Sequence, residues 1–461
     1  MTVVAGPAGR TRRVPPGPPR TATFRLLREL FTDRLSLLSS AASRYGDAAR
    51  IAIGPKALYL FNSPEGAKHV LADNSSNYHK GIGLVEAKKV IGDGLLTSEG
   101  ELWRTQRKLI QPAFQHKRIA AQAGVVAAEA GQLVDRLRNR IGAGPVDMTH
   151  EMTGLTLGVL GRTLLDSDLG DLGDLGSIGH AFESVQDQAM FEAVTLSLVP
   201  SWLPLPMQRR SRKANAELRD VVNTLVARRA ERAGEDVAGA DVLSRLIEST
   251  RRESDPAVGA KRLRDELVTL LLAGHETTAS TLSWALYLVG RHPEVAARLR
   301  EEAATVLGDR PPEFADLRRL SYTGMVVQEV MRMYPPVWLL PRIALAEDEV
   351  AGFHVPAGSD VVVCPYTMHR HPDFWHRPEL FDPDRFHPDH TADRPRYAYI
   401  PFGGGPRFCV GSNLGTMEAV FTLAMISREL RLRGAAGPAV AEPMLSLRVR
   451  GGLPMTVHPA H

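Results

Sequence analysis

The stretch from Phe402 to Gly411 reads FGGGPRFCVG, and a segment of helical periodicity over 412–430 follows it. This order places Cys409 just before the N-terminus of a helix. The unpaired backbone N–H groups at such a terminus, and its partial positive charge, favour a thiolate over a thiol. The glycines let the backbone pass close to something flat and bulky, because no Cβ intrudes. A soft, charged sulfur donor beside a planar cofactor is what haem-thiolate chemistry requires.

A lone cysteine is most often a small buried apolar side chain. Cys364 lies in the apolar stretch VVVC and is assigned that role. For Cys409, the spacing F-x-x-G-x-R-x-C-x-G resembles the haem-binding signature of the cytochrome P450 family. The resemblance implies that Cys409 binds the iron of a haem b group. It also implies cofactor contacts from other positions of the loop, which are Phe402, Gly403, Arg407 and Gly411.

Helical periodicity dominates the rest of the chain. It covers the ranges 101–114, 118–140, 150–165, 177–195, 207–233, 241–250, 260–290, 293–307, 321–334 and 412–430. Residues 268–273 are apolar almost all round, which indicates that the helix over 260–290 runs through the interior. The sequence therefore predicts a mainly α protein with small β-sheets. The resemblance implies the cytochrome P450 fold, in which a long buried central helix lies over the haem and the cysteine loop lies beneath it.

Three short segments predict β-hairpins, because each has apolar runs on both sides of residues that favour a turn. The segments are 47–63 with Gly54-Pro55, 350–364 with Pro356-Ala357-Gly358, and 445–457 with Gly451-Gly452. We expect the strands to be few and short.

The positive charge of the chain is concentrated at its start. Residues 1–20 contain four arginines and no acid, and the formal net charge is +4, so residues 21–461 are formally neutral. A neutral body lacks the basic cluster that nucleic-acid binding requires. We divide the chain into a basic, proline-rich tail over 1–20 and a single haem-thiolate monooxygenase domain over 21–461.

The location of the protein is predicted from what the sequence lacks. No window approaches eighteen apolar residues, so we expect no membrane span, and the start of the chain has no apolar segment typical of a signal peptide. Two cysteines cannot form a disulfide framework in a chain of this size, which favours a reducing compartment. We expect a cytoplasmic protein, with a monomer as the default.

An acid and an alcohol interrupt the apolar helix over 260–290, in the stretch AGHETT that begins at Ala273. Their burial is costly unless they are used, although Thr often bonds to a carbonyl one turn earlier and Glu can reach water. The stretch resembles the oxygen-activation segment of the family. The resemblance implies that Glu276 and Thr277 deliver protons during oxygen activation. It further implies that Gly274 leaves room for the oxygen and that Ala273 faces the substrate.

Glu329 and Arg332 lie three residues apart on one predicted helical face, and Pro335-Pro336 ends that helix. Such a pair is most often an exposed ion pair of small effect. Together with Arg385 in the sequence PDRF, it resembles the Glu-Arg-Arg triad of the family. The resemblance implies a structural ion network behind the haem, without a chemical role.

A haem carries two propionates, whose burial requires cations and hydrogen-bond donors. Each candidate below is on its own most often a solvated surface group. The resemblance implies propionate contacts from Trp103 and Arg107 in W-x-x-x-R, Lys80 in NYHKG, Arg342 in LLPR, and Arg407.

The resemblance implies a reaction that consumes dioxygen, two electrons and two protons, and that inserts oxygen into a C–H or C=C bond. Only about thirty residues follow the last predicted helix, so we expect electrons from NAD(P)H to arrive through separate proteins. For a member of this type the resemblance suggests a ferredoxin and a ferredoxin reductase. A basic docking face for the ferredoxin is predicted from Arg104, Lys108, Lys117 and Arg118.

The substrate pocket is predicted by position along the chain. Its expected residues are all aliphatic and indicate a small hydrophobic substrate held by shape: Leu96, Ala273, Val337, Leu339 and Leu445. These positions are equally compatible with plain core. Three residues fall in the stretch that would form a lid over the pocket: Phe182, Met190 and Phe191. A terpenoid, a polyketide-type macrocycle and a fatty acid all fit such a lining.

Two other classes of function remain open. A peroxide-driven peroxygenase or isomerase needs no electron donor, and the presence of Glu276 and Thr277 disfavours it. A non-enzymatic haem sensor or ligand-binding protein has no use for a proton relay. The reduced, carbon monoxide-bound spectrum and turnover with and without redox partners distinguish these classes.

Overall fold

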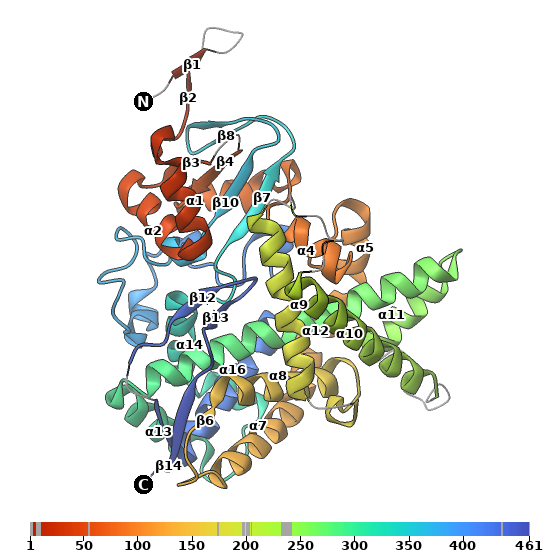
Figure 1. Cartoon of the computed structure of the whole chain (residues 1–461). Helices are drawn as coiled ribbons and strands as arrows, with labels where there is room; N and C mark the ends of the chain where they lie inside the picture. Colours follow the sequence, from red (N-terminus) through yellow and green to blue (C-terminus); the bar gives the residue numbers. More distant parts are fainter. Residues whose placement is uncertain are drawn as a thin grey trace.

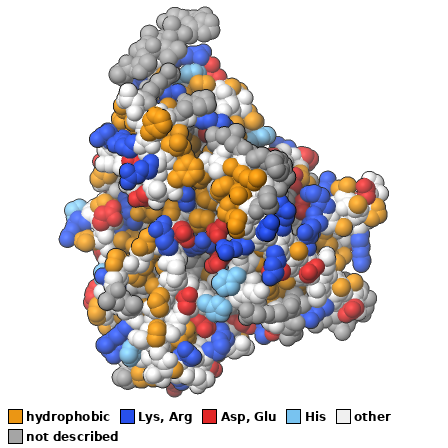
Figure 2. All heavy atoms as spheres, viewed as in Figure 1, with side chains coloured by type: hydrophobic (Ala, Val, Ile, Leu, Met, Phe, Trp, Pro, Cys, Tyr) orange, Lys and Arg blue, Asp and Glu red, His pale blue; other side chains and the backbone are white. Residues whose placement is uncertain are grey.

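The structure is a computed structural model that describes residues 3–5, 11–53, 56–172, 175–195, 199, 203, 205–231, 242–434 and 437–460. Most of these residues are helical, and the strands form small sheets, as predicted. Figure 1 shows one sheet with α1 and α2 in the upper part of the molecule and a larger group of helices below it. Acidic and basic side chains both occur across the face drawn in Figure 2.

Each predicted helical range contains one or two observed helices. They are α5 (Gly100–Ile110), α6 (His116–Ala121), α7 (Ala123–Arg138), α8 (Met148–Leu164), α9 (Leu175–Val194), α10 (Pro206–Glu231), α11 (Val242–Arg251), α12 (Pro256–Val289), α13 (Pro293–Leu307), α14 (Ser321–Met333) and α16 (Ser412–Glu429). The range 101–114 ends in a 3-10 turn at Gln111–Phe114, where Pro112 cannot continue the α-helical hydrogen bonding. Helices that we did not predict are α1 (Thr23–Thr32), α2 (Arg34–Tyr45), α3 (Pro64–Lys68), α4 (Leu84–Ile91) and α15 (Pro365–Met368).

Helix α12 is the central element of the molecule. It crosses the middle of Figure 1 and contacts α8, α11, α14 and α16. Its residues 265–272 are all buried, which confirms the interior helix that the apolar sequence indicates. Pro256 at its first turn and the side chain of Asp255, which accepts from the backbone N–H of Ala257, fix its start.

The largest sheet has the strand order β3-β4-β10-β7-β5. Its strands are β3 (Ala48–Ile53), β4 (Lys56–Phe61), β10 (Asp360–Val363), β7 (Leu340–Ala344) and β5 (Tyr78–Lys80). The hairpin predicted over 47–63 is confirmed by the antiparallel pairing of β3 with β4, while its turn at Gly54-Pro55 lies outside the described residues.

The hairpin predicted over 350–364 is wrong. Its turn lies at Ala351 and Gly352, between β8 (Asp348–Val350) and β9 (Phe353–Val355). Strand β10 instead pairs parallel to β4 and antiparallel to β7. All four residues of β10 are buried, so its apolar side chains are satisfied between two neighbours rather than at the edge of a hairpin.

The hairpin predicted over 445–457 is also wrong. Strand β13 (Leu447–Val449) pairs with β12 (Ala441–Pro443), and β14 (Pro454–Pro459) pairs with β11 (Leu430–Gly434) and β6 (Val146–Asp147). Gly451 and Gly452 have positive φ angles of 74° and 88°, which suits the turn that the sequence predicts at this position. They turn the chain from one sheet to another instead of joining paired strands.

Among the described residues, no helix has both the length and the apolar character needed to cross a membrane.

Candidate active site

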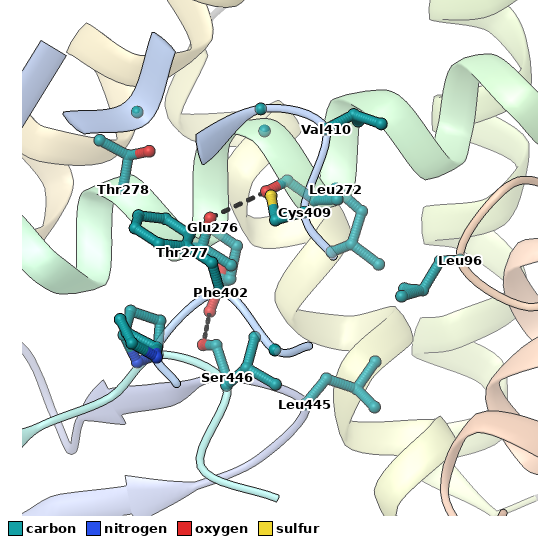
Figure 3. A pocket seen from close by; sticks show the side chains of 18 of the residues that line it. Leu96, Leu272, Glu276, Thr277, Thr278, Phe402, Cys409, Val410, Leu445 and Ser446 are labelled. Carbon is teal, nitrogen blue, oxygen red and sulfur yellow. Dashed lines mark hydrogen bonds between the residues drawn. The ribbon is translucent and has the colours of Figure 1, made fainter. Parts of the chain in front are cut away.

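A cavity of about 370 Å³ lies between α12 and the cysteine loop over 402–411. All of the residues predicted for the cofactor, the oxygen-activation segment and the substrate line it. They come from segments far apart in the sequence: Lys80, Leu96, Trp103, Arg107, Ala273, Gly274, Glu276, Thr277, Val337, Leu339, Arg342, Phe402, Gly403, Arg407, Cys409, Gly411 and Leu445. Figure 3 shows part of this lining, with Cys409 and Thr277 projecting into the same space.

The cysteine loop is held in shape by its own backbone. The N–H of Cys409 donates to the carbonyl of Phe402 at 3.0 Å, and α16 begins three residues after the cysteine, as predicted. Gly403 and Gly405 have positive φ angles of 74° and 64°. A Cβ on Gly405 would lie 1.8 Å from the carbonyl oxygen of Leu71, so the close approach at this glycine is to protein rather than to a cofactor.

Burial and nearby positive charge have opposite effects on the pKa of the Cys409 thiol. The surrounding protein raises the pKa of its thiol, whereas the N–H groups of Gly411 and Ser412 and the charge of Arg107 lower it. Burial is the largest of these effects, so the helix terminus alone does not suffice to ionise the sulfur. A bound metal cation would supply the missing positive charge, and Cys409 faces the cavity, where such a cation could reach it. Cys364 is fully buried, as predicted.

Two of the predicted propionate contacts are already engaged with protein. The guanidinium of Arg407 forms an ion pair with Glu99, donates to the carbonyl of Ser98 at 2.9 Å and lies 3.9 Å from the ring centre of Trp103. Arg107 donates to the carbonyl of Phe408 at 2.7 Å and so ties α5 to the cysteine loop. Glu99 was not predicted, because a residue 308 positions from its partner gives no local signal.

Lys80 and Arg342 meet on the adjacent strands β5 and β7 and line the cavity. Burial, together with the charges of nearby cations, holds the pKa of Lys80 well below its usual range. Burial also lowers the pKa of Arg342, to about 10. Among the described residues, no carboxylate lies within ion-pair distance of either side chain. The charge of Glu99 opposes both shifts, and anions in the cavity would offset them further; the two carboxylates of a haem fit this requirement.

Two polar residues of α12, Glu276 and Thr277, line the cavity, and each has a defined hydrogen-bond partner. The hydroxyl of Thr277 donates to the carbonyl of Ala273 at 2.9 Å, which is the local contact considered from the sequence. Glu276 is not simply solvated: its Oε1 accepts from the hydroxyl of Ser446 at 2.6 Å (Figure 3). Gly274 lines the cavity, and its predicted role toward the oxygen stays a prediction. A Cβ there would lie 2.7 Å from Leu160 of α8, so this glycine permits close packing of the two helices.

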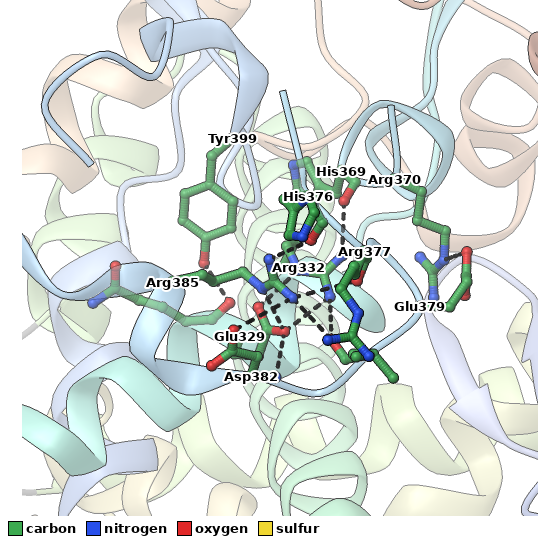
Figure 4. Close-up of polar contacts among 12 residues, drawn as sticks. Glu329, Arg332, His369, Arg370, His376, Arg377, Glu379, Asp382, Arg385 and Tyr399 are labelled. Carbon is green, nitrogen blue, oxygen red and sulfur yellow. Dashed lines mark hydrogen bonds and ion pairs between the residues drawn. The ribbon is translucent and has the colours of Figure 1, made fainter. Parts of the chain in front are cut away.

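The predicted triad forms a buried ion network (Figure 4). Glu329 accepts from Nε and Nη2 of Arg332 at 2.7 and 2.9 Å, and from Nε of Arg385 at 3.0 Å. Arg332 also donates to the carbonyls of His369 and Leu380. None of the three charged residues lines the cavity, which agrees with a structural assignment.

The substrate end of the cavity is less uniformly aliphatic than predicted. Thr269 of α12, Gln186 of α9 and Ser446, which lies just before β13, also belong to its lining. Of the expected lid residues, Met190 lines the cavity. Phe182 is buried, with its ring 4.9 Å from that of His275, and Phe191 is not part of the lining that the structure describes. These polar contributions were missed because they lie at positions without a recognisable motif.

Comparison with known proteins agrees with this geometry. The cytochrome P450 family model matches residues 15–443. Cyclooctatin synthase of Streptomyces melanosporofaciens is 37% identical over 87% of each chain. Cyclooctat-9-en-7-ol 5-monooxygenase of the same organism is 35% identical over 90% of this chain and 89% of its own. Pentalenene oxygenase of Streptomyces avermitilis is 33% identical over 85% of this chain and 86% of its own.

With the cysteine loop, the central helix and the ion network in place, and relatives aligned over nearly their whole lengths, the chain belongs to the cytochrome P450 family and is a haem-dependent monooxygenase.

Proposed function

We propose that the protein hydroxylates or epoxidises a terpenoid. The observation that carries this proposal is a mostly apolar cavity that has Cys409 on one side and Glu276 with Thr277 on the other. Such a cavity selects a hydrophobic molecule by shape and places it beside groups that can donate protons. The names of the relatives, a cyclooctat-9-en-7-ol monooxygenase and a pentalenene oxygenase, support a terpenoid over a fatty acid or a macrocycle.

In this proposal, Cys409 is the ligand of the iron in haem b. Lys80 and Arg342 neutralise the propionates, and Arg407 with Trp103 borders them. The bound haem supplies the redox centre at which dioxygen is activated. The chain itself orients the substrate against Ala273.

The proton path in this proposal consists of Glu276 and Thr277. The carboxyl of Glu276 releases a proton into the cavity, and the hydroxyl of Thr277 passes a proton on and can regain one from its neighbour. The apolar lining, which includes Leu96, Val337, Leu339 and Leu445, excludes bulk water from this path.

The first experiment tests the cysteine and the substrate class together. Purified protein, reduced and treated with carbon monoxide, is expected to show the Soret band of a thiolate-ligated haem, and Cys409→Ala is expected to lose it. Cys364→Ala is the matched control and should retain the band. Titration with terpenoids, fatty acids and macrocycles should give a low-to-high-spin shift with the terpenoids. An unaltered band in Cys409→Ala, or a shift given only by the other two classes, contradicts the proposal.

We further propose that electrons arrive from an acidic ferredoxin that docks near α5. Arg104, Lys108, Lys117 and Arg118 are exposed there, and Arg107 on the same helix contacts the cysteine loop. Reversing Arg104 and Lys108 to Glu should slow ferredoxin-dependent turnover by roughly tenfold at low salt while leaving substrate affinity unchanged. Reversal of Arg431 and Arg433 on β11 is the control. Equal turnover of the two double variants would exclude this face.

A further inference from the structure

His275 precedes Glu276 in α12 and is fully enclosed by protein. Its Nδ1 lies 2.6 Å from the carbonyl oxygen of Leu271, one helical turn earlier. A carbonyl oxygen only accepts hydrogen bonds, so Nδ1 must carry a hydrogen. In the neutral imidazole, Nε2 is then a bare acceptor. The ring also packs on Phe182 of α9, which limits its rotation.

The acceptor nitrogen of His275 faces another acceptor. Its Nε2 lies 3.6 Å from Oε2 of Glu276, and among the described residues it has no hydrogen-bond partner. A buried bare nitrogen is left without a partner, and the repulsion between its lone pair and the facing carboxylate oxygen adds to that cost. One proton between them removes this cost, whether it is held by the oxygen or by the nitrogen.

Ser446 fixes the orientation of this pair. Its hydroxyl donates to Oε1 of Glu276 at 2.6 Å (Figure 3). The other carboxylate oxygen, Oε2, is left for His275. Ser446 is itself buried and comes from the segment before β13, 170 residues away in the sequence. Burial lowers the pKa of His275, and the negative charges of Glu276 on its own helix and Glu183 on α9 oppose this effect.

We propose that His275 holds a reserve proton for Glu276, and that Ser446 is a positioning residue that keeps the carboxylate in contact with this reserve. The inference rests on the proposed role of Glu276 as a proton donor. The established activity consumes protons in every turnover, so the carboxyl of Glu276 must be supplied with a proton each time. The step uses the one shared proton: the Nε2–H bond of His275 breaks, an Oε2–H bond forms on Glu276, and Glu276 then releases that proton into the cavity. No electron changes hands, and His275 regains its proton through Glu276 between turnovers.

The state of the ring is tested without turnover. Protein labelled with ¹⁵N-histidine is examined by NMR in the ferrous, carbon monoxide-bound form, which is diamagnetic. We expect the His275 ring to carry hydrogen on Nδ1, and we expect the Nε2 resonance to shift in Glu276→Gln, because the shared proton is lost. Hydrogen on Nε2 with a bare Nδ1, or an Nε2 resonance that is the same in Glu276→Gln, would overturn the proposal even if terpenoid oxidation is established.

The consequence for catalysis is tested with His275→Gln, whose amide can donate to Glu276 but cannot release a proton at neutral pH. We expect roughly tenfold less product per NADPH consumed, with the missing electrons recovered as hydrogen peroxide. In the native protein this yield should fall as pH rises, and the variant should lose that dependence. Substrate affinity should change by less than about twofold, because the side chain does not line the cavity.

Matched variants separate proton storage from simple packing. His180→Gln alters an exposed histidine of α9 that lies 3.0 Å from Glu183, and it should match the native protein. Ser446→Ala should lower the product yield, and Ser446→Thr, which keeps a hydroxyl, should restore most of it. A native yield and pH profile in His275→Gln, or equal yields in the two Ser446 variants, would refute the proposal.

Discussion

Glu329 is the residue at which the polar contacts behind the cavity converge. Both of its oxygens are engaged by Arg332 and Arg385, and the backbone N–H of Asp382 donates to it at 2.9 Å. Because Glu329 and Arg332 have no exposed side-chain surface, neither charge can be satisfied by water if the other is removed. At the residue scale, the network therefore stabilises the protein through complete pairing and not through any single ion pair.

Arg332→Lys tests this argument. Lysine keeps the positive charge but cannot make the paired contacts with Glu329 or reach the carbonyls of His369 and Leu380 at the same time. We expect the free energy of unfolding to fall by about 3 kcal/mol or more, measured by denaturant titration. Arg104→Lys alters an exposed pair with Glu101 and should cost less than about 1 kcal/mol. Equal effects at the two positions would contradict the role assigned to the buried network.

At the scale of elements, α12 holds the loop over 92–99 through two consecutive carboxylates. The backbone N–H of Asp93 donates to Asp265 at 3.0 Å, and that of Leu95 donates to Glu266 at 3.1 Å. This loop carries Leu96 into the cavity. Gly94 belongs to the same contact, because a Cβ there would lie 2.2 Å from the hydroxyl oxygen of Thr269. The position of the substrate wall is therefore fixed by the central helix.

The free energy of unfolding should depend on pH through this contact between α12 and the loop over 92–99. Burial, followed by the charges of Asp265 and Asp93, raises the pKa of Glu266 to about 7. The folded protein then retains a proton that the unfolded chain releases near pH 4.5, so stability falls as pH rises from about 4.5 to 7. The full effect corresponds to about 3 kcal/mol. In Glu266→Gln, denaturant titrations at pH 5 and pH 8 should differ less than in the native protein. An unchanged difference would contradict this assignment, and Glu301→Gln, at an exposed site, is the control.

At the scale of the whole molecule, the proposed cofactor site exists only where distant segments meet. Strands β5 and β7 supply Lys80 and Arg342, α5 supplies Arg107, and the loop before α16 supplies Cys409. Among the described residues, the side chains of Lys80 and Arg342 have no ion-pair partner, and the charge of Glu99, which pairs with Arg407, only partly offsets theirs. We therefore expect Lys80 and Arg342 to destabilise the haem-free protein and to stabilise the haem-bound protein.

Arg342→Gln tests this reversal. We expect the variant to raise the unfolding temperature of the haem-free protein, because one unneutralised buried cation is removed. In the haem-loaded protein it should lower the unfolding temperature, because a propionate loses its partner. Calorimetry of both forms measures the two changes, and Arg433→Gln on the exposed part of β11 should alter neither. A shift of the same direction in both forms would contradict the assignment of Arg342.

The local sequence predicts those features that local physics controls. The helical periods, the cysteine before a helix, the glycines with positive φ and the Glu-x-x-Arg pair all depend on residues a few positions apart. The hairpins over 350–364 and 445–457 were wrong for the opposite reason. Strands β10 and β14 pair with partners that lie far away in the sequence, and alternation of side chains does not encode which partner is chosen.

By itself, the sequence determined the helical fold class, and it predicted Cys409 as the thiolate ligand and many of the residues that line the cavity. Tertiary structure alone decided how these residues are satisfied: Ser446 reaches Glu276 across 170 positions and Glu99 reaches Arg407 across 308. The physical reason is that a buried polar group takes whichever partner the packed chain brings within about 3 Å, and separation along the sequence does not limit that choice.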